Sequence, residues 1–407
     1  MHEKGRPAVD ILGELAARQA EEPDVGAARL FGLVYPSGRA DLDTLLTEVN
    51  RRYLFGNALN PLRFPRLADM ESEVVRSVAW LLNRPPGETA GGVMTSGGTE
   101  SILMAMLVSR ERARARGVER PVIVAPRSAH PAYAKAAHYF GMDLVQVPLD
   151  ERWRADSAAA ARSIDERTAV VVASAFSYPY GVMDPVEELA AHAARVGAAC
   201  HVDACIGGFV LPFLERLGRE VPPWDFRVSG VTSISADVHK YGYVPKGASV
   251  VVHRDDDWFA HQVFLYDRWG AGLYGSGAIA GARPAAPVAC AWAAFNYLGI
   301  EGYTAITAEL GTVTGRFRTL VSTLPGLEVL GDPIGPVLAL FSEEVDLHAV
   351  AAAMDSRGWH LNRLTEPRGL HVMLSPGHAA VFPELARDLA DAVAHHGDAV
   401  EGEVRYS

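Results

Sequence analysis

Short apolar runs alternate with longer segments of helical periodicity through the middle of the chain. The short runs are typical of buried strands, and they lie at residues 122–125, 144–147, 169–174, 199–202, 233–236 and 249–252. This rhythm predicts a mainly parallel sheet with helices on both faces, because parallel strands need helical crossovers. Binding groups are then expected on loops at the carboxyl ends of the strands. We assign residues 60–300 to this large domain.

The segments on either side follow different patterns. Residues 1–59 contain a helical stretch, a Tyr-Pro-Ser-Gly turn at 35–38 and a second helix from Asp41, which is typical of an arm. The apolar stretch 284–300 is shorter than the roughly 20 residues that span a bilayer, so we expect a buried helix and no integral membrane segment. Residues 301–407 predict a smaller C-terminal α+β domain. Its expected strands are 327–330, 337–341 and 371–374.

Composition narrows the class of protein. A chain of 407 residues, 49% hydrophobic and 21% charged, suits a globular protein with a large domain and a smaller companion. The formal net charge of −11 opposes binding to nucleic acid or to anionic membranes, so an anionic ligand must meet locally placed cations. The cysteines Cys200, Cys205 and Cys290 have neither a disulfide pattern nor metal-ligand spacing, and no signal peptide is apparent. We therefore expect a cytoplasmic protein without a metal site.

A lysine stands at the end of one predicted strand. The sequence Ser-Ile-Ser-Ala-Asp-Val-His-Lys occupies residues 233–240. The amine of Lys240 can form an imine with an aldehyde cofactor only when it is neutral, and a half-buried site beside other cations favours that form. His239 and Lys246 are the candidate cations. Taken alone, Lys240 would more often be a solvated surface side chain, so its neighbours decide the interpretation.

A carboxylate is expected near the same edge of the sheet. His201-Val202-Asp203 closes another apolar strand and is followed by a glycine pair at 207–208. Asp203 can keep a pyridine nitrogen protonated, and a protonated ring withdraws the electrons released when a bond at the substrate's α carbon breaks. A helix N-cap is the alternative role for this aspartate.

Two further features complete the candidate site. The sequence Thr-Ser-Gly-Gly-Thr-Glu-Ser at 95–101 opens an apolar helix, where backbone amides, the helix dipole and the Thr99 hydroxyl can hold a phosphate. Helix capping alone is the alternative explanation. His130 follows the strand 122–125 and can either stack on a flat ring or serve as an ordinary surface histidine. Only the combination of lysine, carboxylate, glycine loop and histidine favours a pyridoxal-phosphate site.

Three long phrases carry a family resemblance. They are Thr-Ser-Gly-Gly-Thr-Glu-Ser-Ile-Leu at 95–103, His-Val-Asp-Ala-Cys-Ile-Gly-Gly-Phe at 201–209 and Thr-Ser-Ile-Ser-Ala-Asp-Val-His-Lys-Tyr-Gly-Tyr at 232–243. The chain resembles the sphingosine-phosphate lyases, in the group II decarboxylase-like branch of fold-type I pyridoxal-phosphate enzymes, from about residue 35 to 371. The resemblance implies an α/β fold with a mainly parallel seven-stranded sheet, a smaller C-terminal α+β domain and pyridoxal 5'-phosphate as cofactor.

The resemblance also implies a role for each matching residue of the cofactor site. Lys240 would hold the cofactor covalently, Asp203 would face its ring nitrogen, and His130 would stack on its ring. Gly98 and Thr99 would hold its phosphate, and His239 also belongs to the cofactor-binding set.

A second group of residues is expected to act across subunits or on the substrate. The sequence Tyr-Gly-Ser-Gly at 274–277 matches the family's loop that reaches the cofactor phosphate from the neighbouring subunit, so Gly275 and Ser276 imply a homodimer with shared active sites. The family's substrate-phosphate contacts map onto Tyr35, Asn60 and Lys246.

Three departures from the family pattern bear on the substrate. Arg63 stands where the family usually has histidine, Gly277 replaces a proline, and residues 175–178 diverge. Arg63 keeps a positive charge and offers a planar fork to an anion, so we retain it among the substrate-binding candidates.

The expected reaction is a retro-aldol cleavage of a phosphorylated 3-hydroxy-2-amine, such as sphingosine phosphate, to a fatty aldehyde and phosphoethanolamine. An amino-acid decarboxylase is the main alternative, because the same cofactor cleaves whichever α bond the pocket aligns with its ring. A non-catalytic binding protein is a further alternative, and the joint presence of Lys240, Asp203 and His130 disfavours it.

Overall fold

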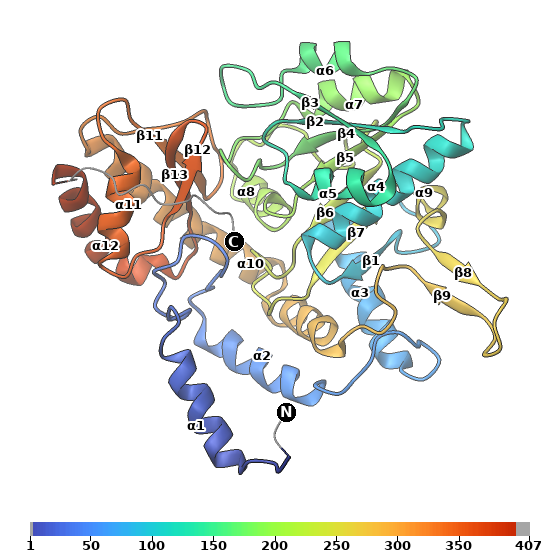
Figure 1. The fold of residues 1–407 in the computed structure, drawn as a ribbon, viewed down its shortest axis with the longest axis horizontal. Coiled ribbons are helices and arrows are strands. Elements are labelled where there is room, and N and C mark those ends of the chain that lie inside the picture. Colours follow the sequence, from blue (N-terminus) through green and yellow to red (C-terminus); the bar gives the residue numbers. More distant parts are fainter. Residues whose placement is uncertain (1–2, 396–407) are drawn as a thin grey trace.

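A seven-stranded sheet forms the centre of the computed structural model, which describes residues 3–395 (Figure 1). The strand order is β1-β7-β6-β5-β4-β2-β3, and only β7 runs antiparallel to its neighbours. The strands are β1 (Gly92–Thr95), β2 (Val122–Pro126), β3 (Asp143–Val147), β4 (Thr168–Ser174), β5 (Ala199–Asp203), β6 (Ser233–Ala236) and β7 (Ser249–His253). The mainly parallel sheet is thus confirmed, and each of the six strands expected from apolar runs is present.

Helices cover both faces of this sheet (Figure 1). Successive side chains of a strand point to opposite faces, and β4 illustrates the result. Val170 and Val172 join one apolar cluster with α4 and α5, whereas Val171 and Ala173 join the other with α7. The helices of this region are α3 (Pro65–Leu81), α4 (Gly98–Ala115), α5 (Ala132–Phe140), α6 (Ser157–Ser163), α7 (Val186–Arg195), η1 (Gly207–Phe209), α8 (Leu211–Arg216) and α9 (Asp256–Ala260).

The C-terminal part forms a separate antiparallel sheet of order β10-β11-β13-β12, with α11 packed on it and α12 packed against α11. Its elements are β10 (Glu328–Val329), β11 (Val337–Phe341), α11 (Leu347–Asp355), β12 (Asn362–Thr365), β13 (Arg368–Met373) and α12 (His378–Ala394). All three strands expected here are present, and β12 is an addition. β12 is partly exposed and contains Asn362 and Arg363, so it lacks the apolar run used to recognise the others.

One long helix, α10 (Ala285–Thr323), contacts helices of the large region and α12 of the C-terminal part. It contains the expected helical segment 284–300, which is mostly buried as far as Ala294 and largely exposed beyond it. The helix bends at Gly299, whose φ of 54° is open to glycine at little steric cost. The border expected at residue 300 lies beside this bend, inside the helix, and the division into domains remains a prediction. None of the helices in residues 3–395 has the length and apolarity needed to cross a membrane.

The N-terminal segment and a hairpin lie at the edge of the molecule (Figure 1). Helix α1 (Ala8–Gln19) buries no side chain, and α2 (Ala40–Arg52) packs against α10. Between them, the backbone amide of Phe31 donates to the carbonyl of His360 at 3.2 Å, which ties the arm to the C-terminal part. The hairpin of β8 (Phe264–Tyr266) and β9 (Tyr274–Ser276) projects from the opposite side of the molecule.

Candidate functional site

The carboxyl ends of three adjacent parallel strands place polar side chains at one edge of the sheet. Ser174 ends β4, Asp203 ends β5, and Asp237 directly follows β6. The register pairs Ser174 with Asp203, and Asp203 with Ser235 of β6. These ends therefore lie side by side, as parallel strands dictate.

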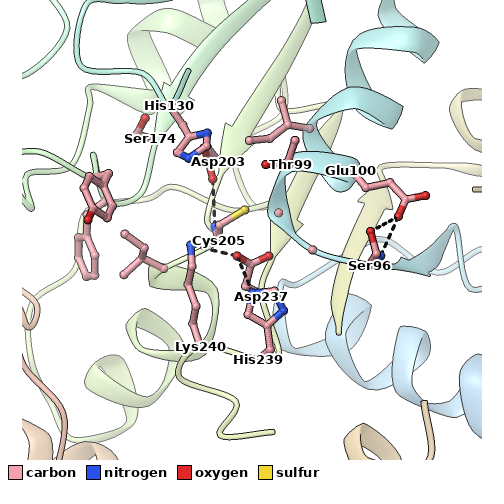
Figure 2. A pocket seen from close by; sticks show the side chains of 16 residues that line it. Ser96, Thr99, Glu100, His130, Ser174, Asp203, Cys205, Asp237, His239 and Lys240 are labelled. Atoms are coloured by element: carbon pink, nitrogen blue, oxygen red, sulfur yellow. Dashed lines mark hydrogen bonds and ion pairs between the residues drawn. The ribbon is translucent and has the colours of Figure 1, made fainter. Parts of the chain in front are cut away.

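A cavity of about 350 Å³ opens at this edge. Figure 2 shows its side chains converging from the first turn of α4, the loop after β2, the loop after β5 and the loop after β6. Six of the expected residues line it: Gly98, Thr99, His130, Asp203, His239 and Lys240. The sequence places these residues up to 142 positions apart in the chain, from 98 to 240, and the fold brings them together.

Lys240 forms an ion pair inside the cavity. Its Nζ lies 3.0 Å from Oδ2 of Asp237, whose side chain is only 2% exposed. Burial opposes the charge of this amine, but Asp237 outweighs burial and raises the pKa of Lys240 well above its usual value. The expectation that neighbouring cations favour the neutral amine is therefore wrong for this chain as it stands.

His239 contributes no positive charge to that balance. Burial lowers the pKa of its imidazole to about 4, against the opposing pull of Asp237. The ring is thus neutral near pH 7 and lies 3.7 Å from Oδ2 of Asp237. Its Nδ1 is buried without a hydrogen-bond partner among the described residues, which leaves it available to a ligand.

The first turn of α4 approaches this pair closely. A Cβ on Gly98 would lie 2.8 Å from both Oδ2 of Asp237 and the thiol sulfur of Cys205, so a side chain cannot be accommodated there without movement. Ser96 donates from its amide and its hydroxyl to Oε2 of Glu100, at 2.8 and 2.6 Å, and fixes the entry to the helix. The first amides of a helix have no partner within it, so this turn can receive an anion.

His130 and Asp203 lie at the end of the cavity away from His239 (Figure 2). The Nδ1 atom of His130 accepts the amide proton of Ala132 at 3.1 Å, and burial lowers the pKa of the ring, so His130 is neutral near pH 7. Asp203 accepts the amide proton of Cys205 at 3.1 Å through Oδ1. The next helix, η1, takes Ile206 as its N-cap, so Asp203 does not serve as the helix cap that was its alternative role.

Tyr35 and Lys246 lie together beside this cavity. The Lys246 ammonium sits 4.5 Å from the centre of the Tyr35 ring, and Nζ donates to the carbonyl of His239 at 3.4 Å. Burial and the charge of Lys240 lower the pKa of Lys246 to about 8. The surroundings of Lys240 thus include a second amine, which loses its proton more readily than Lys240 does.

Asn60, Arg63, Gly275 and Ser276 do not line the cavity around Lys240. Asn60 and Arg63 are exposed, and Oδ1 of Asn60 accepts the amide protons of Leu62 and Arg63, both at 3.1 Å. Gly275 and Ser276 belong to β9 and line a different cavity of about 390 Å³ together with residues of the same loop as Asn60. The expected residues thus form two separate groups on one chain.

The cavity suits the cofactor expected from the sequence. It offers a lysine amine, a carboxylate, a neutral imidazole and a helix N-terminus, which match an aldehyde, a ring nitrogen, a flat ring and a phosphate. Two buried polar atoms, Oδ1 of Asp237 and Nδ1 of His239, lack partners within residues 3–395 and so leave hydrogen-bonding capacity for a bound group. The residues present therefore fit pyridoxal phosphate.

Sequence reasoning missed several residues of the cavity. Asp237 was part of the recognised phrase at 233–240, but only its position directly after a strand could have signalled that it reaches the same edge as Asp203. Glu100 was likewise quoted without a role, although it accepts the amide proton of Ile279 at 2.9 Å and joins α4 to the loop after β9. Phe176 and Tyr178, in the divergent segment 175–178, line the cavity as well.

Comparisons with known proteins agree with this geometry. Residues 35–340 match the family model described as "Pyridoxal-dependent decarboxylase conserved domain". A sphingosine-1-phosphate lyase of Oryza sativa is 41% identical over 94% of this chain and 72% of its own length. The solved structure of a sphingosine-1-phosphate lyase of Burkholderia pseudomallei has a TM-score of 0.92 at 38% identity and covers 97% of this chain and 92% of its own. A glutamate decarboxylase of Lactobacillus brevis shares the fold, with a TM-score of 0.85 at 22% identity over 97% and 94% of the two chains.

Proposed function

Since this chain belongs to the sphingosine-1-phosphate lyase family, we propose that it cleaves a phosphorylated 3-hydroxy-2-amine to a fatty aldehyde and phosphoethanolamine. The enzyme is a pyridoxal-phosphate-dependent lyase. One observation carries the proposal: Lys240, Asp203, His130 and the first turn of α4 converge on a single cavity. Pyridoxal phosphate, when bound, supplies the electron sink for breaking a bond at the substrate's α carbon.

Each side of the cavity has its own task in this proposal. Lys240 binds the cofactor, Asp203 holds a proton on the ring nitrogen, and the neutral ring of His130 stacks on the flat face. Gly98 and Thr99 present amides and a hydroxyl to the phosphate at the helix N-terminus, where the dipole favours negative charge. Support comes from position, because all of these groups line one cavity of about 350 Å³.

The substrate's phosphate would be held at the side of Tyr35 and Lys246. These two residues already contact each other, and Lys246 supplies a positive charge below about pH 8. A phosphate monoester there meets an ammonium and a phenol, both hydrogen-bond donors.

The lining of the cavity favours the lyase over an amino-acid decarboxylase. A decarboxylase must hold its substrate's carboxylate, and the planar fork of arginine is the side chain best suited to that task. No arginine lines the cavity around Lys240 in the part of the chain that the structure describes. The described part of one chain therefore supplies no arginine there for an α carboxylate, and Arg63, which the proposed dimer brings to the partner's cavity, is assigned to the substrate's phosphate.

Two copies of the chain would complete the site. Large apolar side chains are exposed on the loop that carries Asn60 and Arg63 and on the hairpin that carries Gly275 and Ser276. On the loop, Phe55 is 96% exposed and Leu62 is 90% exposed. Contiguous exposed apolar surface of this kind marks an association site. In the proposed homodimer this surface is covered, and the second group of residues reaches the partner's cavity.

We further propose a cytoplasmic enzyme, where the buried free thiols of Cys200, Cys205 and Cys290 stay reduced.

Product analysis tests the proposal. Purified protein with pyridoxal phosphate is incubated separately with sphingosine phosphate and with a panel of amino acids, and the products are identified by mass spectrometry. We expect a long-chain aldehyde and phosphoethanolamine in equal amounts from the first reaction only. Carbon dioxide and an amine from an amino acid, with no aldehyde from sphingosine phosphate, would overturn the lyase in favour of the decarboxylase.

A further inference from the structure

We propose that Asp237 controls the proton of Lys240: it holds the amine as an ammonium in the cofactor-free chain and accepts the proton when the amine reacts. The inference rests on the proposed function in one respect, namely that Lys240 is the amine that binds the cofactor. It adds a residue to the site, because Asp237 is absent from the set expected from the family phrases.

The backbone fixes the pair before any ligand binds. Asp237 follows the last residue of β6, and the amide of Lys240 donates to the Asp237 carbonyl at 3.2 Å in a tight turn. This turn brings Nζ to 3.0 Å from Oδ2. At that distance a proton can pass directly between the two groups.

The surroundings keep the carboxylate ionised despite burial. Burial raises the pKa of Asp237, but the surroundings, above all the charge of Lys240, outweigh burial, so the pKa is lowered overall. The neighbouring Ser249 hydroxyl donates to the Ala236 carbonyl at 3.3 Å and contacts the Ser101 hydroxyl at 2.8 Å. The N-terminal turn of α4 adds a favourable dipole at Gly98.

The other polar groups around the pair cannot replace Asp237. Burial and nearby carboxylates raise the pKa of the Cys205 thiol well above its usual value, so it stays protonated, and the rings of His130 and His239 are neutral near pH 7. Among residues 3–395, Asp237 makes the only ion pair of Lys240. The remaining groups that interact with the charges of Lys240 and Asp237 are Tyr35 and Lys246.

The proton has to move for the amine to act. An ammonium has no lone pair, so Nζ first gives its proton to Oδ2, which leaves a neutral amine and a neutral carboxylic acid. The amine's lone pair then forms a bond to an aldehyde carbon, and the aldehyde oxygen leaves as water with the two hydrogens that remain on nitrogen. Asp237 retains the transferred proton within the cavity.

The test measures the protonation of Lys240 in the full chain after removal of the cofactor. The sequence has only four lysines, at positions 4, 135, 240 and 246, so each labelled peptide is easily assigned. The protein is briefly labelled with acetic anhydride across a pH series, and peptides are quantified by mass spectrometry. In the unmodified chain we expect Lys240 to reach half-labelling at a higher pH than the exposed Lys135. Half-labelling of Lys240 at or below the pH of Lys135 would overturn the proposal without any variant.

Substitution sharpens the test. Asp237→Asn removes the charge, so the half-labelling pH of Lys240 should fall by at least about one unit, which is roughly tenfold faster labelling at pH values below both midpoints. Glu100→Gln is the matched control. It changes a buried carboxyl group of the same cavity that is not among the groups shifting the pKa of Lys240, so the half-labelling pH of Lys240 should be unchanged. An unchanged midpoint in a folded Asp237→Asn protein, checked by circular dichroism, contradicts the proposal. Asp237→Ser serves if the amide variant does not fold.

Failure of this inference is distinguishable from failure of the proposed function. The labelling experiment involves neither cofactor nor substrate, so its outcome is independent of turnover. Incorporation of pyridoxal phosphate is followed separately by absorbance. Normal incorporation of pyridoxal phosphate with no elevation of the half-labelling pH of Lys240 would contradict the role of Asp237 alone. An elevated half-labelling pH without incorporation of pyridoxal phosphate would contradict the cofactor assignment alone.

Discussion

Single charged side chains determine what each part of the cavity can bind. Lys240 is held as an ammonium by Asp237, whereas Lys246, further from that carboxylate, has a pKa lowered to about 8. Two lysines six positions apart in the sequence therefore have opposite shifts. The difference arises because Lys240 is paired with a buried carboxylate, whereas Lys246 is desolvated and repelled by the charge of Lys240.

The pKa of Lys246 leads to a prediction about substrate binding. Its positive charge is present below about pH 8 and is lost as the pH rises through that value. KM for the phosphorylated substrate should therefore increase several-fold between about pH 7 and pH 9.5, with little change in kcat. In Lys246→Arg the guanidinium stays charged, so this increase should disappear. Steady-state kinetics of both proteins provide the check, and an identical increase in the arginine variant would contradict the role of Lys246.

For single residues, the sequence predicted those that belong to recognisable motifs. Six of them line one cavity: Gly98, Thr99, His130, Asp203, His239 and Lys240. It did not predict how they act on one another. The charge of Lys240 depends on a 3.0 Å contact made by a turn, and no pattern of residue types specifies that distance. Asp237 was missed for this reason.

The N-terminus of α4 is the element that most constrains the site. It carries the candidate phosphate-binding residues, and it lies against the loops after β5 and β6. Glycine at position 98 makes this approach possible, because a Cβ there would overlap Asp237 and Cys205.

Substitution at this helix end tests the close approach. Gly98→Ala should destabilise the fold by about 1–3 kcal/mol through overpacking and weaken binding of pyridoxal phosphate. Gly311→Ala, inside α10 with no atom within 4 Å of its added Cβ, is the control and should be neutral or stabilising by about 0.4–1 kcal/mol. Chemical unfolding and a cofactor titration measure both effects. Equal stability and cofactor affinity in the two variants would refute the packing argument.

Elements were predictable where burial is complete. β2, β4, β5, β6 and β7 are buried along their whole length and were found from apolar runs alone. β1 and β8 were missed, since β1 is half-buried at Gly92 and β8 is exposed. Pairing with a neighbouring strand, rather than burial, defines these two elements.

In the whole molecule, the expected site residues fall into two separate groups. One group of expected residues lines the cavity around Lys240, and the other lies on an exposed loop and hairpin at the edge of the chain. Their separation could not be read from the sequence, because the resemblance implied a shared site without giving the placement of either group on one chain. The proposed homodimer would account for both the separation and the exposed apolar side chains.

A substitution in the hairpin tests the dimer. The unmodified chain should have the mass of two copies by light scattering. Leu265→Asp places a charge on an apolar side chain that is 63% exposed in one chain, so it should dissociate the dimer and abolish turnover. Tyr139→Asp, at a side chain 60% exposed on α5, should leave the mass and the activity unchanged. A fully active single chain would show that no second copy is needed.

The central claim is that Lys240 binds the cofactor, and borohydride trapping tests it most directly. The holoenzyme is reduced with sodium borohydride, digested and mapped by mass spectrometry. The account predicts a stable pyridoxyl-phosphate adduct on the peptide containing Lys240 and on none containing Lys4, Lys135 or Lys246. A holoenzyme whose reduced adduct lies elsewhere, with Lys240 unmodified, would contradict it.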